Sequence, residues 1–250
     1  MTEQNKFISI DTMPLYTDNI GHVTLYDASH ANESGEQRIW TVTTIASLAY
    51  GNEEAKNPET LYERMKSIKH ESLWEFIRDI EEGCRTIGGS MRSAPEYYNS
   101  HFTSNSMVHK ANIACFRIKV PMFVRAQFMR HRSFSYLEMS RRYTKGAKVP
   151  FEFWYPPELH KLGSFDIEEM NNYYMNQYNI FIEHSLETQV ASRFLPQTAY
   201  TEFYMMGEVE GLKNFFRLRL DSHAQQEIRE VAEAMLELLR IHQPELHKKV

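Results

Sequence analysis

The densest group of polar side chains in this sequence lies in the segment Arg130–Tyr143, which holds four arginines, one histidine, three serines and one acid. Guanidinium groups present a planar fork of donors that matches phosphate oxygens, and serine hydroxyls add further donors. Gln127 lies one helical turn before Arg130 and His131, so its amide can share their face and read the edge of a heterocyclic ring. Residue types alone therefore indicate either a site for a phosphorylated nucleotide or a solvated basic helix end.

Two segments elsewhere in the chain carry residues that suit a further part of such a site. In residues 69–75, His70 lies beside acids, which fits either a surface ion pair or a functional group. In residues 214–228, Arg219 and His223 are four apart, so they share a helical face or flank the start of a helix. Either Asp221 or Ser222 is a candidate cap for the helix that follows.

The elements that must position these residues alternate between strands and helices, which favours a mixed α/β fold. Strands are expected at residues 7–10, 22–26 and 113–120. Helices are expected to begin at Pro58 and Pro121 and to span residues 167–190, 211–220 and 224–241. The apolar stripe of the helix after Pro121 is expected to comprise Met122, Phe123, Ala126 and Met129. Residues 83–112 lack periodicity and are expected to form an irregular insertion in a single domain that spans residues 1–250.

The composition of the chain argues against several classes of protein. Its formal net charge of −5 disfavours a dedicated nucleic-acid-binding domain, and basic clusters within an acidic chain favour a small anion as ligand. The two cysteines, Cys84 and Cys115, fit neither a disulfide scaffold nor a cysteine-based metal site, so no metal is expected. The sequence shows no signal peptide and no apolar run long enough to cross a membrane, so we expect a cytoplasmic protein without membrane contacts.

The pattern Arg130-His131-Arg132, then seven residues, then Ser140 resembles the signature of the flavin-dependent thymidylate synthases. The flanking stretches PMFVRAQFMRHR and EMSRRYTK, and the later FEFWYPP, are similar to that family as well. Residues 70–75 resemble its His-x-Ser/Thr-x-x-Glu stretch, with Glu75 as the weaker contact. Residues 214–228 resemble its N-F-x-x-L-R-x-x-x-H-A-Q-x-E-I pattern. The resemblance covers most of the chain from His70 onward, in three separate blocks.

The resemblance implies an α/β (α+β) fold with a mixed or antiparallel central sheet, flanking helices and a homotetramer whose subunits share active sites. It also implies reductive methylation of dUMP to dTMP, with methylenetetrahydrofolate as carbon donor, FAD as hydride carrier and NADPH as reductant. This route needs no enzyme nucleophile, and neither cysteine lies in the matching blocks. The expected partners are therefore small molecules and further copies of the chain, with no nucleic acid.

The resemblance also assigns roles to individual residues. It implies that Arg219 is catalytic, because a fixed guanidinium stabilises negative charge on the uracil ring and favours its N3-deprotonated form. The residues expected to contact FAD are His70, Ser72, Arg130, His131, Arg132, Glu138 and Asn214. The residues expected to contact dUMP are Gln127, Phe128, Met129, Arg130, Glu138, Met139, Ser140, Arg141, Arg142, Arg193 and Arg219. Ser140 is expected to bind the nucleotide rather than attack it, since no evident base activates its hydroxyl.

The sequence departs from the family pattern at three places. Residues 83–112 are longer than usual, and Glu208 and Glu210 stand where the family has a flavin-contacting Asn-x-Arg. The arginine of the family's A-R-x-x-L-P stretch has moved by one residue, so either Ser192 or Arg193 makes the nucleotide contact. A catalytically lapsed flavin- or nucleotide-binding protein is therefore one alternative function. A second is a nucleic-acid-binding module that uses residues 125–142 as a phosphate track.

Overall fold

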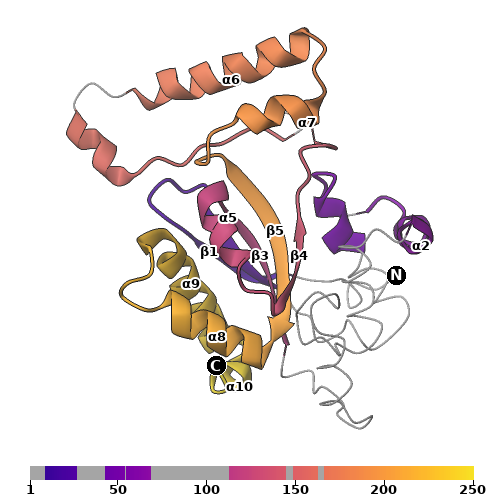
Figure 1. Cartoon of the computed structure of the whole chain (residues 1–250). Coiled ribbons are helices and arrows are strands. Elements are labelled where there is room, and N and C mark those ends of the chain that lie inside the picture. The colour runs from indigo at the N-terminus through magenta and orange to yellow at the C-terminus, as the bar shows by residue number, and fades with distance from the viewer. Residues whose placement is uncertain (1–8, 27–42, 54, 69–112, 145–148, 163–165) are drawn as a thin grey trace.

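The structure, a computed structural model, describes residues 9–26, 43–53, 55–68, 113–144, 149–162 and 166–250. Its centre is a five-stranded sheet in the order β1-β2-β3-β5-β4, in which every neighbouring pair is antiparallel. The strands are β1 (Ser9–Pro14), β2 (His22–Tyr26), β3 (Ile113–Pro121), β4 (Phe134–Glu138) and β5 (Tyr200–Glu208). The prediction of an antiparallel central sheet with flanking helices is therefore confirmed (Figure 1).

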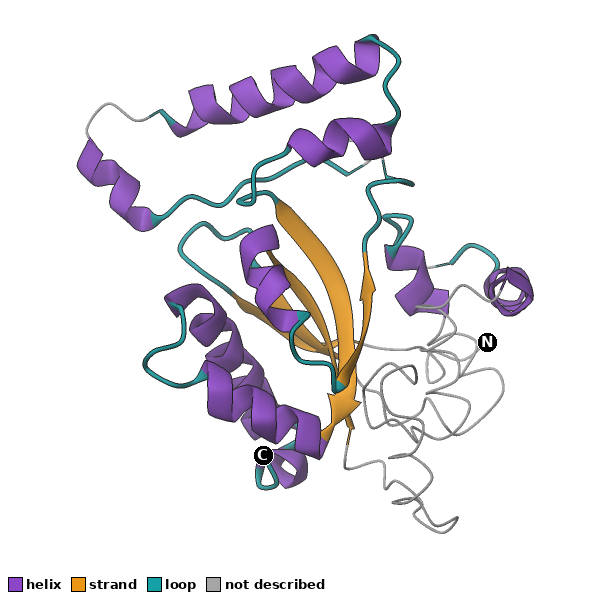
Figure 2. Cartoon of the chain, viewed as in Figure 1, coloured by secondary structure: helices purple, strands orange, loops and turns teal. Residues whose placement is uncertain are grey.

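Three helices cover one face of this sheet and enclose the largest apolar core (Figure 2). They are α5 (Met122–Phe128), α8 (Val209–Arg219) and α9 (Gln226–His242), and the short α10 (Pro244–His247) follows α9. Phe116, Ile118 and Phe203 point from the strands toward the helices and are fully buried there. Burying large apolar side chains of this kind contributes about 1.5–3 kcal/mol each, so this core fixes how α5 and α8 lie against the sheet.

The opposite face of the sheet divides into an apolar and a charged half. Its apolar half packs against α2 (Pro58–Ile68) and a short helix at residues 43–48. In its charged half, Arg117 donates from Nε to Glu202 Oε1 at 2.7 Å, and His22 lies 3.4 Å from the same carboxylate oxygen. Burial would raise the pKa of Glu202, but hydrogen bonds and charge from His22 and Arg117 hold it at about 2.

A smaller layer lies beyond the end of the sheet, where α6 (Ile167–Glu183) and α7 (Thr188–Ala191) run above the strands in Figure 1. Two 3-10 helices, η4 (Pro157–Leu162) and η5 (Ser192–Phe194), connect this layer to the rest of the chain. Its own small core includes Phe151, Phe153 and Tyr178. No helix in the described part of the chain is long and apolar enough to span a membrane.

Most elements agree with the sequence-based expectations, and two strands were not expected at all. The strands at 22–26 and 113–120 and the helices from Pro58, at 211–220 and at 224–241 are confirmed with small shifts of their ends. The first strand lies at residues 9–14 rather than 7–10. β4 and β5 were missed, because β5 is buried on both faces and therefore lacks the alternation that marks a half-buried strand.

Three local predictions were wrong in whole or in part. Of the stripe predicted for α5, Phe123 and Met129 do pack against the core, but the buried residues of the helix are Val124 and Phe128, and Met122 is 37% exposed. The helix expected over 167–190 ends at Glu183, and Ser185 there has a positive φ of 62°, a left-handed conformation that an α-helix cannot continue through. Neither predicted side chain caps α9, whose N-cap residue is Gln225. The predicted insertion at 83–112 lies outside the described residues.

Candidate functional site

Arg219, the last residue of α8, points toward the end of α5 and the turn after it. Its Nε donates to His131 Nε2 at 2.9 Å, and its Nη2 donates to the backbone oxygen of Gln127 at 3.0 Å. Its Nη1 donates to the side-chain Oε1 of Gln127 at 3.4 Å. Arg219 is thus joined to Gln127 and His131, which lie about 90 residues earlier in the sequence, in one polar cluster that we call the Arg219 group.

A guanidinium can only donate hydrogen bonds, and this fixes the hydrogen-bonding state of both neighbours. His131 Nε2 must be unprotonated to accept from Arg219, so the neutral ring carries its hydrogen on Nδ1. Burial lowers the pKa of His131 to about 4, and the positive charges of Arg219 and Arg130 act in the same direction. Burial and the nearby Arg130 also lower the pKa of Arg219. Even so, a guanidinium stays charged at neutral pH.

Aromatic side chains pack against the turn after α5, which carries His131 of the Arg219 group. Phe128 is fully buried, stacked on Phe215 with ring centroids 5.2 Å apart. The His131 ring meets the same Phe215 edge-on at 5.0 Å. The hydroxyl of Tyr136 lies 2.8 Å from the backbone oxygen of Phe128 and 3.1 Å from that of His131, so it bridges the two ends of the turn.

A glycine permits this packing. A Cβ atom at Gly207 of β5 would lie only 2.1 Å from the Phe134 ring, which sits at the start of β4. Any larger residue at position 207 would therefore push β4, and the turn before it, away from the sheet.

Glu138 at the end of β4 is held by two residues that the sequence did not single out. Its carboxylate pairs with Arg125 of α5 and accepts from the Thr201 hydroxyl at 2.8 Å. Thr201 is 8% exposed and belongs to β5. The carboxylate therefore has a fixed direction before any ligand binds.

Just after Glu138, at the end of β4 opposite to Phe134, lies a second cluster, Ser140, Arg141 and Arg142, which we call the Ser140 group. The Arg141 guanidinium lies 4.3 Å from the centroid of the Phe151 ring and donates to the Val149 oxygen at 2.9 Å. The Ser140 hydroxyl accepts from the Arg142 amide at 3.3 Å. Arg142 also lines a cavity of about 330 Å³ together with Tyr143, Glu187, Thr188 and Gln189.

No hydrogen bond or ion pair between described residues of the chain joins these two groups directly. β4 separates them, and its five residues rise about 3.3 Å each. His131, which Arg219 of α8 contacts, precedes β4, whereas Ser140 follows it, and Arg142 lines a cavity with residues of α7, the helix beyond that end of the sheet in Figure 1. Arg193 is exposed on η5, next to α7, and the neighbouring Ser192 hydroxyl donates to Gln189 O at 3.4 Å.

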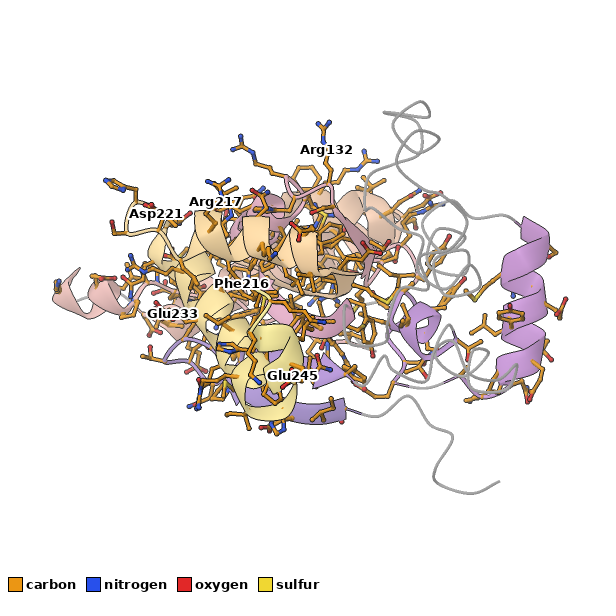
Figure 3. The ribbon with its side chains drawn as sticks, turned by 90° about the horizontal axis from the view of Figure 1, so that it is seen from below. Arg132, Phe216, Arg217, Asp221, Glu233 and Glu245 are labelled. Carbon is orange, nitrogen blue, oxygen red and sulfur yellow. The ribbon has the colours of Figure 1, made fainter. Side chains whose placement is uncertain are left out.

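Other predicted contact residues divide into exposed and buried ones. Arg130 and Arg132 are exposed, and among the described residues no carboxylate forms an ion pair with either (Figure 3 shows Arg132 projecting from the ribbon). Asn214 on α8 is exposed and accepts from Arg217 at 2.8 Å. Glu210, one of the two unexpected acids, pairs with Lys213 at 2.9 Å.

Some predicted contacts are poorly placed for a side-chain contact with a ligand. Phe128 belongs to the core, so a contact with dUMP at this position would have to come from its backbone. Met139 is 8% exposed, and Met129 packs partly buried against the main core. His70 and Ser72 lie outside the described residues.

The sequence analysis missed Tyr136, Thr201 and Gln225 as parts of this region. Tyr136 lies within the basic segment, but an aromatic between serines carries no sign that its hydroxyl will bridge a turn. Gln225 accepts a hydrogen bond from Gln127 Nε2 at 2.7 Å, and its sequence signal was its place as the glutamine of the H-A-Q-x-E-I stretch that residues 214–228 resemble. A separate cavity of about 500 Å³ lies among α8, α9 and α10, and no predicted site residue lines it.

Comparison with known proteins adds an independent observation. The profile of the family described as thymidylate synthase complementing protein matches residues 91–245. A flavin-dependent thymidylate synthase of Thermotoga neapolitana is 34% identical over 173 residues, which cover 66% of this chain and 74% of that protein. One of Pseudothermotoga lettingae is 36% identical over 137 residues, which cover 50% of this chain and 60% of that protein.

Among solved structures, a UMP/dUMP methylase from Streptomyces cacaoi bound with 5-Br UMP aligns with a TM-score of 0.45 and 20% identity. That alignment covers 55% of this chain and 71% of the other, and a likeness at this level carries no argument about the site.

Proposed function

This chain belongs to the thymidylate synthase complementing protein family, and on this basis we propose that it is a flavin-dependent thymidylate synthase that converts dUMP to dTMP. The proposal includes methylenetetrahydrofolate as carbon donor and NADPH as reductant, and it takes Arg219 as the catalytic residue. The observation that carries it is the Arg219 group. In this group the half-buried Arg219 guanidinium and the Gln127 amide are held in place by hydrogen bonds, and Arg219 also contacts the neutral His131 ring.

The Arg219 group offers donors to a ligand. Arg219 has only N–H groups, and the Gln127 oxygen already accepts from it, so the amide of Gln127 is left with its NH2 side. A site that presents only hydrogen-bond donors favours a ring whose facing edge has only hydrogen-bond acceptors. Uracil deprotonated at N3 presents O2, N3 and O4 as such an edge, whereas cytosine carries a donor at its 4-amino group. Arg219 would therefore stabilise the negative charge that activates the uracil ring.

The residues present also fit a flavin dinucleotide. Arg130 and Arg132 are exposed cations without an acidic partner in the described part of the chain, which suits a pyrophosphate. Asn214 lies on the exposed side of α8 and can offer its amide to a heterocycle. Glu210 is paired with Lys213, which offsets the charge that an acid at this position would otherwise direct at phosphate. When bound, the flavin would supply the hydride that the reductive methylation requires.

Sharing of sites between subunits of a homotetramer accounts for the separation of the two groups. One chain holds the Arg219 group and the Ser140 group at opposite ends of β4. A dUMP molecule needs a ring contact and a phosphate contact at the same time. We therefore propose that the Arg219 group of one subunit faces the Ser140 group of another.

The test is tritium release from 5-tritiated dUMP in the presence of methylenetetrahydrofolate, NADPH and FAD. Release by the wild-type protein, together with flavin absorbance that remains after gel filtration, is the expected result. A protein that takes up no added flavin and releases no tritium would overturn the proposal. Binding of oligonucleotides without affinity for dUMP would favour the nucleic-acid-binding alternative instead.

A further inference from the structure

Gln225 directly precedes α9, but its side chain does not cap that helix. It is the N-cap residue of α9, and its side chain makes no capping hydrogen bond. Serine, threonine, aspartate or asparagine at this position would satisfy a free backbone amide and typically stabilise a helix by about 1 kcal/mol. A residue that forgoes this stabilisation and reaches elsewhere is a candidate for a functional role.

The side chain of Gln225 reaches the Arg219 group. Its Oε1 accepts from Gln127 Nε2 at 2.7 Å, which is shorter than the 3.4 Å between the Gln127 side chain and Arg219. The oxygen of the Gln127 amide then accepts from Arg219 Nη1 at 3.4 Å. Gln225 is thus linked to the guanidinium through a single intervening amide.

The direction of each amide in this chain of contacts is determined by its neighbour. Because Arg219 only donates, the atom of Gln127 that faces it is the oxygen, and the NH2 group must face Gln225. The atom of Gln225 that faces Gln127 must then be its oxygen. Without this acceptor, the Gln127 amide would lose the contact that holds its NH2 group away from Arg219, and it could rotate to water.

We propose that Gln225 is a positioning residue, which orients the Gln127 amide and through it the Arg219 guanidinium. This inference rests on the proposed function, since the reaction is what Arg219 would serve. The Gln127 NH2 group has two hydrogens, and Gln225 takes one of them. The second hydrogen is then held in a fixed direction, available to a carbonyl oxygen of the ring. Gln225 would therefore favour uracil over cytosine without touching either base.

The first test compares two replacements at this position. Gln225→Met keeps the length of the side chain and removes the acceptor, and it is expected to lower kcat/KM for dUMP about tenfold, the effect of one lost hydrogen bond. Gln225→Glu keeps an acceptor oxygen and is expected to stay within about threefold of wild type. Gln226→Met is the matched control, because Gln226 is exposed and its Nε2 donates to Glu230 instead.

Two further readouts separate positioning from a merely structural role. If Gln225 acts only through Gln127, then Gln225→Met has no additional effect on kcat/KM in a Gln127→Ala background. A less well-held Arg219 stabilises the N3-deprotonated ring less, so the midpoint of the pH profile of kcat/KM should move to higher pH in Gln225→Met. Thermal unfolding of each variant shows whether the fold has changed.

The outcomes are distinguishable from failure of the proposed function. Absence of tritium release by the wild-type protein overturns the enzyme assignment. An active wild type in which Gln225→Met and Gln226→Met behave alike, or in which the Gln225→Met and Gln127→Ala losses simply add, overturns the role of Gln225 alone.

Discussion

The two ends of β4 carry polar clusters that are built in different ways. In the Arg219 group, Arg219 donates directly to the side chains of His131 and Gln127, and His131 is only 5% exposed. In the Ser140 group, the arginines lie near aromatic rings and backbone oxygens instead, and Arg142 is exposed. The difference indicates that the first cluster is organised before a ligand arrives, whereas the second presents charge on a surface that another molecule can complete.

This contrast bears on what each cluster can do. Preorganised donors in a partly buried site stabilise developing charge without having to reorient, which is the larger effect in catalysis. Exposed guanidinium groups suit a phosphate, whose charge they neutralise in more than one geometry. We therefore expect changes to the Arg219 group to affect the rate and changes to the Ser140 group to affect nucleotide binding.

The strongest test of this contrast is Arg219→Ala. We expect kcat/KM for dUMP to fall by about 10² to 10³, the usual cost of removing one preorganised donor. The measurement is tritium release at several dUMP concentrations, and Arg240→Ala serves as control because Arg240 pairs with Glu237 on the surface of α9, away from the Arg219 group. Equal activity of Arg219→Ala and wild type would remove Arg219 from its role.

A second test asks whether the two ends of β4 meet across subunits. Arg219→Ala and Arg142→Glu are each expected to be nearly inactive, but mixed oligomers should regain about a quarter of the wild-type activity, because random assembly of shared sites leaves that fraction intact. The assay is tritium release after co-expression and purification of the two chains. If both residues served a site within one chain, mixing would restore nothing.

A third test uses the suppressed pKa of His131. Because burial and nearby arginines lower this pKa from 6.5 to about 4, the unfolded state binds one more proton than the folded state between these values. The free energy of unfolding should therefore fall as pH falls through this window, by up to about 1.4 kcal/mol per pH unit. His131→Gln removes this contribution, so urea unfolding of wild type and variant should converge toward pH 4. Parallel pH profiles would contradict the buried, neutral state.

The smallest expected effect concerns the turn that supports the Arg219 group. Tyr136→Phe removes the hydroxyl that bridges the backbone oxygens of Phe128 and His131, and it should lower the free energy of unfolding by about 1 kcal/mol. Tyr173→Phe is the matched control, because Tyr173 is 57% exposed on α6. Urea unfolding of both variants gives the comparison. A loss no greater than that of Tyr173→Phe would show that the bridge contributes nothing.

The elements that could be predicted from the sequence are the amphipathic ones, which bury one face and expose the other. α9 and β3 were found because their apolar residues recur with a helical or a strand period. β5 was not found, since all of its residues but the last are buried and no period remains. β4 was not found because its residues were interpreted for their chemistry, and a polar functional segment hides the pattern of a strand.

The same limit applies to the site. Residue types and resemblance were enough to propose Arg219, His131 and Gln127 as members of one site, and the structure places these three in contact. Gln225 and Thr201 could not be inferred, because their roles depend on distances between elements and not on spacing along the chain. Nor could the sequence show that Ser140 lies at the far end of β4 from Arg219.

The position of β5 between β3 and β4 also has a consequence for the order in which the protein is made. β1 and β2 pair as neighbours in sequence, but β3 and β4 have no common partner until residues 200–208 have been synthesised. Contacts between such distant segments slow folding, and strand edges that have not yet found their partner are prone to aggregate. Gln127 and His131 leave the ribosome well before Arg219, so we expect the two halves of the Arg219 group to meet only at the last stage of folding. A nascent chain stalled before residue 200 would lack both β5, the shared partner of β3 and β4, and Arg219.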